Sequence, residues 1–195
     1  MNKDEIRKVA KHEVGHYLIS RALNIFPKGI SFTFLQYKDG YIEYQGMTET
    51  EFNKTFETLD DVYNYAHDKC LLSIAGSFAE NFDESFNKII IEKAKKEFEE
   101  LQPQDQLITQ EALHIILGCN SEIKKNSIFP ALETLDKMYK EVTDYINNNY
   151  NLLIKLTNYV VENIEKNYGQ NIYIPAKNLE IKVNTYPILE KKILN

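Results

Sequence analysis

The chain has only two cysteines, Cys70 and Cys119, among its 195 residues. They lie far apart and form no CxxC pattern. Disulfide frameworks and thiolate metal sites both need several cysteines at short spacings. We therefore predict two buried free thiols without a functional role.

Long hydrophobic runs and an excess of positive charge are also missing. The longest apolar stretch, Leu71 to Ala79, contains three small polar or flexible residues and is far shorter than the roughly 20 residues that cross a bilayer. A net charge of −6 provides no basic surface for nucleic acid or anionic lipid. The charged N-terminus lacks the apolar region of a secretory signal. We expect a cytoplasmic protein with no membrane span and no nucleic-acid partner.

The length of the chain and its 43% hydrophobic content indicate one domain over residues 1–195. Apolar and polar residues alternate at positions 30–34, which is typical of a β-strand. Asp39-Gly40 follows, and then a second strand-like segment at 41–45. This pattern predicts a hairpin with a tight turn and an exposed edge. The residues Pro27 to Gly29 are expected to separate the hairpin from the helix that precedes it.

Helical periodicity dominates the rest of the chain, and the predicted class is mainly α with a small β-sheet (α+β). An apolar core helix is expected over residues 59–82, and a solvated, charged one over 89–101 that ends at Pro103. The helix beginning near Asp105 is expected to bury Ile108, Ala112, Ile115 and Ile116. A C-terminal helical pair follows, with apolar positions from Leu132 to Ile146 and from Leu152 to Ile164 and a break at residues 147–149. A mixed tail, 171–195, is expected to be extended or irregular because of Pro175 and Pro187.

The first predicted helix, residues 4–24, contains the sequence His12-Glu13-Val14-Gly15-His16. Residues four apart differ by about 40° around a helix, so both imidazoles leave the same face, with Glu13 about 60° from His16. Such a zincin-like HExxH helix supplies two zinc ligands and a carboxylate that can act as general base. The opposite face of the helix carries apolar residues that can pack in a core, namely Ile6, Ala10, Val14, Tyr17 and Leu18. A chance HExxH is on the order of one in a hundred in a chain with 4 histidines.

A catalytic zinc usually has three protein ligands, so a third must come from elsewhere in the chain. Asp105 is a candidate because it lies at the start of a predicted helix, although an aspartate at such a position more often simply caps the helix. The other candidates are acidic residues after the core helix or lone helical histidines, namely Glu80, Glu84, His67 and His114. Spacing alone leaves this choice open.

Three segments together resemble the peptidase domain of the FtsH family, the AAA-linked zinc metalloproteases. VAKHEVGHYL at residues 9–18 is similar to the family's HEAGH helix, and IAGSFAE at 74–80 to its GGRxAEE pattern. QDQLITQEA at 104–112 is similar to its NDLxxAT pattern. The chain differs from the family at Val14, Ser77 and Gln104 and in its charged segment 89–101. The resemblance covers about residues 5–165.

Carried over residue by residue, the resemblance implies that His12, His16 and Asp105 bind Zn2+ and that Glu13 is the catalytic base. The implied activity is that of a zinc metalloendopeptidase. Full-length family members also carry membrane segments and an ATPase module, whereas this chain has no GxxxxGK[ST] sequence. We therefore expect action on peptides or on unfolded or disordered protein segments, unless a separate ATPase partner delivers other substrates.

Two alternatives belong to other functional classes. The first is a catalytically inactive zinc-binding module that keeps the peptidase fold and binds a protein partner. The second is a metal-independent helical interaction protein in which the pentapeptide is accidental. Metal content separates the second alternative from the others, and cleavage of an unfolded protein separates an enzyme from a binding module.

Overall fold

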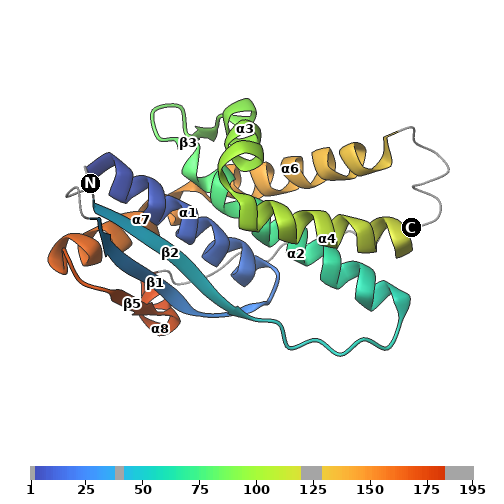
Figure 1. The fold of residues 1–195 in the computed structure, drawn as a ribbon, viewed down its shortest axis with the longest axis horizontal. Coiled ribbons are helices and arrows are strands. Elements are labelled where there is room, and N and C mark those ends of the chain that lie inside the picture. Colours follow the sequence, from blue (N-terminus) through green and yellow to red (C-terminus); the bar gives the residue numbers. More distant parts are fainter. Residues whose placement is uncertain (1–2, 38–41, 120–128, 183–195) are drawn as a thin grey trace. The chain divides into compact units, whose positions relative to one another are not determined.

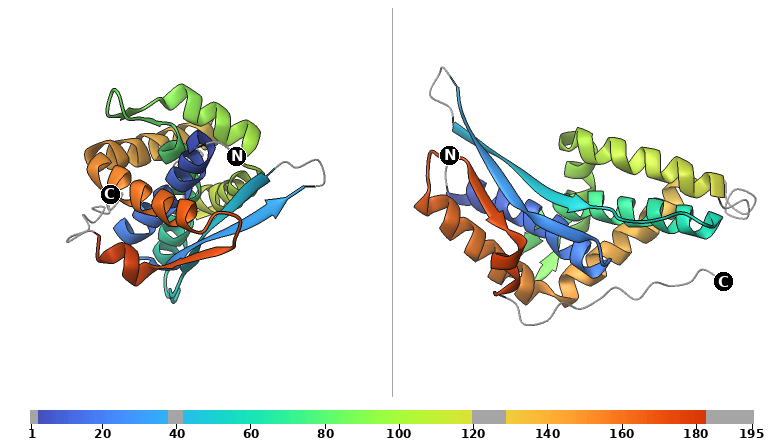
Figure 2. Two further views of the ribbon diagram at one scale, coloured as in Figure 1. Left: turned by 90° about the vertical axis from the view of Figure 1, so that its left-hand side faces the viewer. Right: turned by 90° about the horizontal axis from the view of Figure 1, so that it is seen from below.

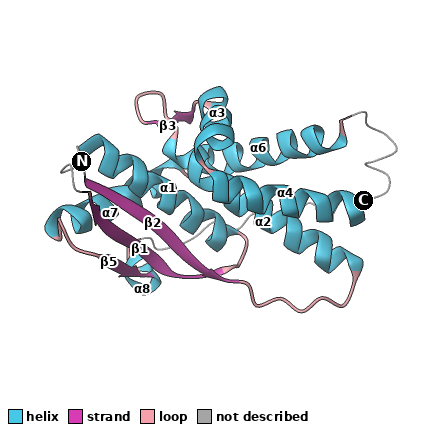
Figure 3. Cartoon of the chain, viewed as in Figure 1, coloured by secondary structure: helices cyan, strands magenta, loops and turns pink. Residues whose placement is uncertain are grey.

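The computed structural model describes residues 3–37, 42–119 and 129–182. Of these residues, 67% are helical, and the longer strands form a small antiparallel sheet (Figure 1, Figure 3). The α+β class predicted from the sequence is confirmed. None of the helices in these three ranges has both the length and the apolar character needed to cross a membrane.

The chain divides into two compact units. The sheet unit comprises Met1–Phe52 and Asn151–Asn195, and the helical unit comprises Asn53–Tyr150. This division does not test whether the chain behaves as one domain, so the single domain over residues 1–195 stays a prediction.

The sheet unit contains a three-stranded antiparallel sheet with the strand order β2-β1-β5 (Figure 2). Helix α1 packs against β1 and β2, and α8 packs against β1 and β5. In chain order the elements are α1 Lys3–Ala22, β1 Phe26–Gln36, β2 Ile42–Glu51, α7 Tyr150–Lys166, β5 Ile172–Pro175 and α8 Ala176–Glu180. The predicted first helix and hairpin are thus confirmed, while the predicted turn at Asp39-Gly40 lies outside the described residues.

The prediction that residues 27–29 separate the first helix from the hairpin is wrong, because β1 already begins at Phe26. The chain leaves α1 instead at Asn24, which has a φ of 55° in the left-handed region. Pro27 is tolerated near the start of the strand, where the pairing with β2 also shifts register. Gly29 is needed because a Cβ there would lie 2.5 Å from the Ile174 carbonyl oxygen.

The expectation of an extended or irregular tail after residue 171 is only partly correct. Residues Ile172–Pro175 form the third strand, in which Ile174 pairs with Ile30, and Ala176–Glu180 form α8. The pairing partner lies more than 140 residues earlier in the chain, so a local pattern cannot reveal it. Pro187 lies outside the described residues.

The helical unit is built around α2, which packs against α3, α4 and α6. Its elements are α2 Leu59–Glu80, β3 Phe82–Asp83, β4 Lys88–Ile89, α3 Ile91–Leu101, α4 Pro103–Cys119 and α6 Pro130–Asn148. Helix α2 begins with a capping box between Thr58 and Asp61, and most of its second half is buried. The prediction of a central core helix is confirmed.

The buried face of α4 differs from the prediction. Ala112 and Ile116 are buried, but Ile108 and Ile115 are 38% and 39% exposed. The buried stripe instead runs through Thr109, Ala112, Leu113 and Ile116. Thr109 enters the core because its hydroxyl lies 2.6 Å from the Ser73 hydroxyl of α2, which satisfies both buried groups. Pro103 begins α4 directly, a first-turn position that proline tolerates.

The two helices predicted near the C-terminus both form. Helix α6 ends at Asn148, Asn149 caps it, and α7 starts at Tyr150, as the asparagine run indicated. The apolar positions of α7 at Leu153, Leu156 and Val160 are buried. In α6 the buried stripe begins only at Thr134, and Leu132, which we expected on this face, is 60% exposed.

Both cysteines are free, but only Cys70 is fully buried. Burial raises the pKa of the Cys70 thiol to about 12. Cys119 is half-buried at the end of α4, so its predicted burial is only partly correct.

This difference predicts site-selective alkylation of the folded protein. At pH 8 we expect iodoacetamide to modify Cys119 while Cys70 stays unmodified, since a thiol with a pKa of about 12 is almost never ionised at that pH. Peptide mapping by mass spectrometry measures the two rates, and denaturant should make Cys70 as reactive as Cys119. Equal labelling without denaturant would contradict the buried position of Cys70.

Candidate metal centre

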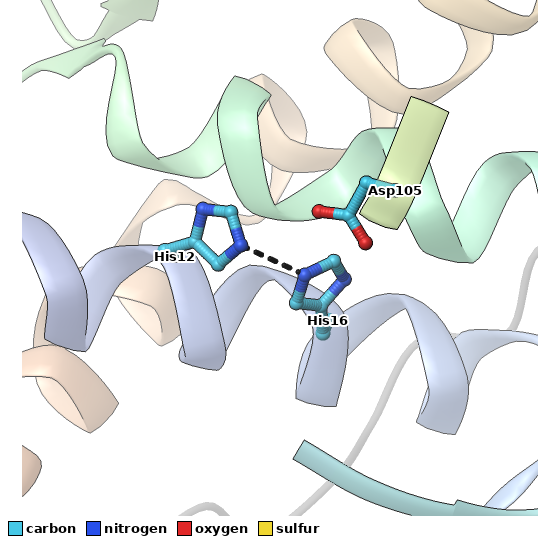
Figure 4. A group of neighbouring side chains, drawn as sticks. All are labelled: His12, His16 and Asp105. Carbon is cyan, nitrogen blue, oxygen red and sulfur yellow. Dashed lines mark hydrogen bonds between the residues drawn. The ribbon is translucent and has the colours of Figure 1, made fainter. Parts of the chain in front are cut away.

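The two histidines of the HExxH motif lie one turn apart on α1, and their rings converge. Their Nε2 atoms are 3.0 Å apart, and the ring planes meet at 77° (Figure 4). Two nitrogens that each lie 2.0–2.1 Å from one tetrahedral zinc are about 3.3 Å apart. The spacing between His12 and His16 is therefore close to the spacing that one shared ion requires.

The remaining faces of α1 anchor it in the core. The predicted apolar positions are all buried, namely Ile6, Ala10, Val14, Tyr17 and Leu18. Tyr17 also donates a hydrogen bond of 3.4 Å from its hydroxyl to the Ala176 carbonyl oxygen. His12 and His16 are only half-buried. The helix is thus held on one side and presents the two imidazoles on the other.

Glu13 lies between the histidines in the sequence and is only 5% exposed. Its carboxylate Oε2 accepts a 2.8 Å hydrogen bond from the Thr48 hydroxyl of β2, and its backbone carbonyl lies 2.9 Å from the same hydroxyl. Because an unpaired buried carboxylate is costly, this contact is the local reason why Glu13 can be buried at this point.

Sequence reasoning missed two residues that surround Glu13, Gly46 and Thr48. The register pairs Gly46 with Phe32 and Thr48 with Ile30, and both partners on β1 are buried. Residues directly opposite each other in an antiparallel pair share a face, so Gly46 and Thr48 face the same side as the buried residues. The available signal was that β2 has glycine and threonine where the alternation expects apolar residues.

Asp105 is the third residue of α4, in its first turn. It therefore lies inside the helix rather than at the preceding N-cap position, and the N-terminal end of the helix dipole favours a carboxylate there. One turn further on, Thr109 fixes α4 to α2 through the Ser73 hydroxyl, and its carbonyl oxygen accepts a 3.6 Å hydrogen bond from the Cys70 thiol. The turn of α4 that carries Asp105 is thus followed directly by a turn that is hydrogen-bonded to α2.

Three side chains form a group that could hold a metal ion, His12, His16 and Asp105. Each offers one ligand atom, and these atoms all lie within 4.8 Å of one another (Figure 4). All three side chains are half-buried. Two imidazole nitrogens and one carboxylate oxygen are a donor set that zinc accepts. The residues present therefore fit the predicted metal.

The other candidates for the third ligand are not part of this group. His67 lies 3.5 Å from the Glu141 carboxylate, which makes it a partner of α6. His114 and Glu84 are exposed, and Glu80 is half-buried at the end of α2. The grouping thus favours Asp105 among the residues that the sequence left open.

The resemblance to the FtsH-family peptidase domain stays a prediction that this geometry does not test. Comparison of the chain with protein-family models and with curated proteins finds no match to either.

Proposed function

We propose that this protein is a zinc-dependent metallopeptidase that hydrolyses peptide bonds in peptides or in unfolded protein segments. The observation that carries the proposal is that the ligand atoms of His12, His16 and Asp105 lie within 4.8 Å of one another. The buried, hydrogen-bonded Glu13 directly follows His12 in the sequence. A set of metal ligands and a carboxylate base are the two parts that metal-assisted hydrolysis of an amide uses.

The two imidazoles and the Asp105 carboxylate would hold the ion. Three protein ligands are the number found in catalytic zinc sites, whereas structural zinc sites usually have four. When bound there, zinc supplies Lewis acidity, which polarises a carbonyl and lowers the pKa of a water molecule to about 7.

Glu13 is the group that would move the proton. Thr48 donates to Oε2, and within the described residues Oε1 accepts no hydrogen bond. The Glu13 carboxylate would take the proton from the attacking water and pass it to the departing amine nitrogen.

The sheet supports the choice of substrate class. Strand β2 is a terminal strand of the described sheet, with β1 on one side. An extended peptide can add to such an edge through backbone hydrogen bonds, which are available only in an unfolded segment and tolerate many side chains. We therefore propose loose sequence preference and action on chains without stable folded structure.

The test is zinc content and proteolysis measured on the same preparation. We expect about one zinc per chain by elemental analysis, in keeping with the one group of ligands found in residues 3–37, 42–119 and 129–182. We also expect cleavage of unfolded casein that stops with a chelator and returns with added zinc. A chain that holds zinc but leaves casein and a library of unfolded peptides intact would favour the binding module instead. A chain that binds no zinc would contradict both readings.

A further inference from the structure

The side of β2 that carries Gly46 and Thr48 is occupied by the Glu13 carboxylate. Thr48 reaches it with its hydroxyl, 2.8 Å from Oε2. Gly46 packs directly against the same carboxylate. A Cβ at position 46 would lie only 2.6 Å from Oε1 and 2.8 Å from Cδ of Glu13. Both residues therefore act on one side chain from the same strand.

Gly46 is needed for space and not for backbone conformation. It is not among the described glycines with a positive φ. The three atoms nearest to an added Cβ all belong to the Glu13 side chain, which can move. A methyl group at position 46 would thus displace the carboxylate and leave the strand in place.

We propose that Thr48 and Gly46 are positioning residues that hold the Glu13 carboxylate in the place from which it transfers protons. Thr48 holds Oε2 by a hydrogen bond, and Gly46 leaves the volume that the carboxylate occupies. A glutamate loses considerable rotamer freedom when it is fixed, so a base held in place before substrate binds reacts without that cost. This inference rests on the proposed role of Glu13 as general base.

The experiment compares three variants, Thr48→Val, Thr48→Ser and Gly46→Ala, in zinc-loaded protein. Because misplacement of a catalytic group by about 1 Å costs about 100-fold in rate, we expect Thr48→Val to lower kcat about 10- to 100-fold with KM and zinc content unchanged. Thr48→Ser restores the hydroxyl and should bring kcat back to nearly the wild-type value. Gly46→Ala should lower kcat at least as much as Thr48→Val and still fold.

Matched controls come from positions away from Glu13. Thr33→Val places the same change on an exposed residue of β1. Gly118→Ala adds a methyl group to α4 where, apart from the chain neighbours and the backbone of the helix itself, no atom lies within 4 Å. Both controls should keep wild-type kcat. If Thr48→Ser is as slow as Thr48→Val, or if Thr48→Val keeps wild-type kcat, the positioning role is overturned.

A readout independent of activity separates this inference from the proposed function. In zinc-free protein, Thr48→Val should lower the melting temperature more in the wild-type background than when Glu13 is already alanine, where only the contact with the backbone carbonyl of residue 13 is left to lose. Absence of this coupling would overturn the inference. If the coupling is present and the wild-type chain cleaves nothing, the proposed function fails and the positioning role fails with it. If the wild-type chain cleaves while kcat of Thr48→Val is unchanged, only the positioning role fails.

Discussion

The Glu13→Gln variant is expected to retain zinc and to cleave unfolded casein about 10²- to 10⁴-fold more slowly than the wild-type protein. Glutamine has the size of glutamate, and its amide oxygen can still accept the hydrogen bond from Thr48. It cannot take up a proton from water, so it removes the base and leaves the ligands unchanged. Elemental analysis and a fluorescent casein assay on the same sample measure the two properties.

Glu5→Gln is the matched control for this variant. Glu5 lies in the first turn of α1 and is exposed, so the same chemical change on the same helix should leave both zinc content and cleavage at wild-type values. Wild-type cleavage by Glu13→Gln would refute the assignment of Glu13 as base. Loss of zinc in that variant would instead indicate that Glu13 contributes to metal binding.

The Asp105→Ala variant is expected to lose most of its zinc affinity, by at least about 100-fold. Loss of partners that only orient ligands already costs 10- to 100-fold in comparable metal sites, and here a ligand itself is removed. The variant should still fold, since a carboxylate in the first turn of a helix contributes about 0.3–1 kcal/mol through the helix dipole. Competition with a chromophoric chelator measures the zinc affinity, and circular dichroism checks the helix content.

Two variants provide the comparison for Asp105→Ala. Asp60→Ala removes an exposed aspartate from the first turn of α2, and it should leave zinc affinity unchanged. Glu80→Ala removes another of the residues that the sequence offered as third ligand, and this variant should also retain zinc. If Glu80→Ala lost zinc and Asp105→Ala kept it, the third ligand would have to be reassigned to Glu80.

The parts of the fold that could be predicted are those with a local cause. The helical spacing of His12 and His16, the alternation of the hairpin and the break near Asn149 each depend on residues within one or two turns of each other. The same holds for the apolar face of α1. Such patterns can be read from the sequence because they reflect the geometry of a single element.

The parts that escaped prediction depend on contacts between distant segments. β5 could not be recognised because it is short and pairs with a strand at the other end of the chain. The buried stripe of α4 was misplaced because a pair of hydroxyls from Ser73 and Thr109 replaces an apolar contact. Gly46 and Thr48 show their role only when β2 is placed against α1. In each case the tertiary partner decides the outcome, and the local pattern does not contain it.

The discontinuous make-up of the sheet unit affects the order in which the molecule can be made. Strand β2 ends at Glu51, whereas its sheet receives its last strand only at Ile172, 121 residues later. At a synthesis rate of about 5–20 residues per second, this interval lasts roughly 6–24 s. During that time the nascent chain contains β1 and β2 but not yet β5, while the whole of the helical unit is translated. The ribosome therefore completes helices α2 to α6 before the sheet against which α1 packs has received its third strand.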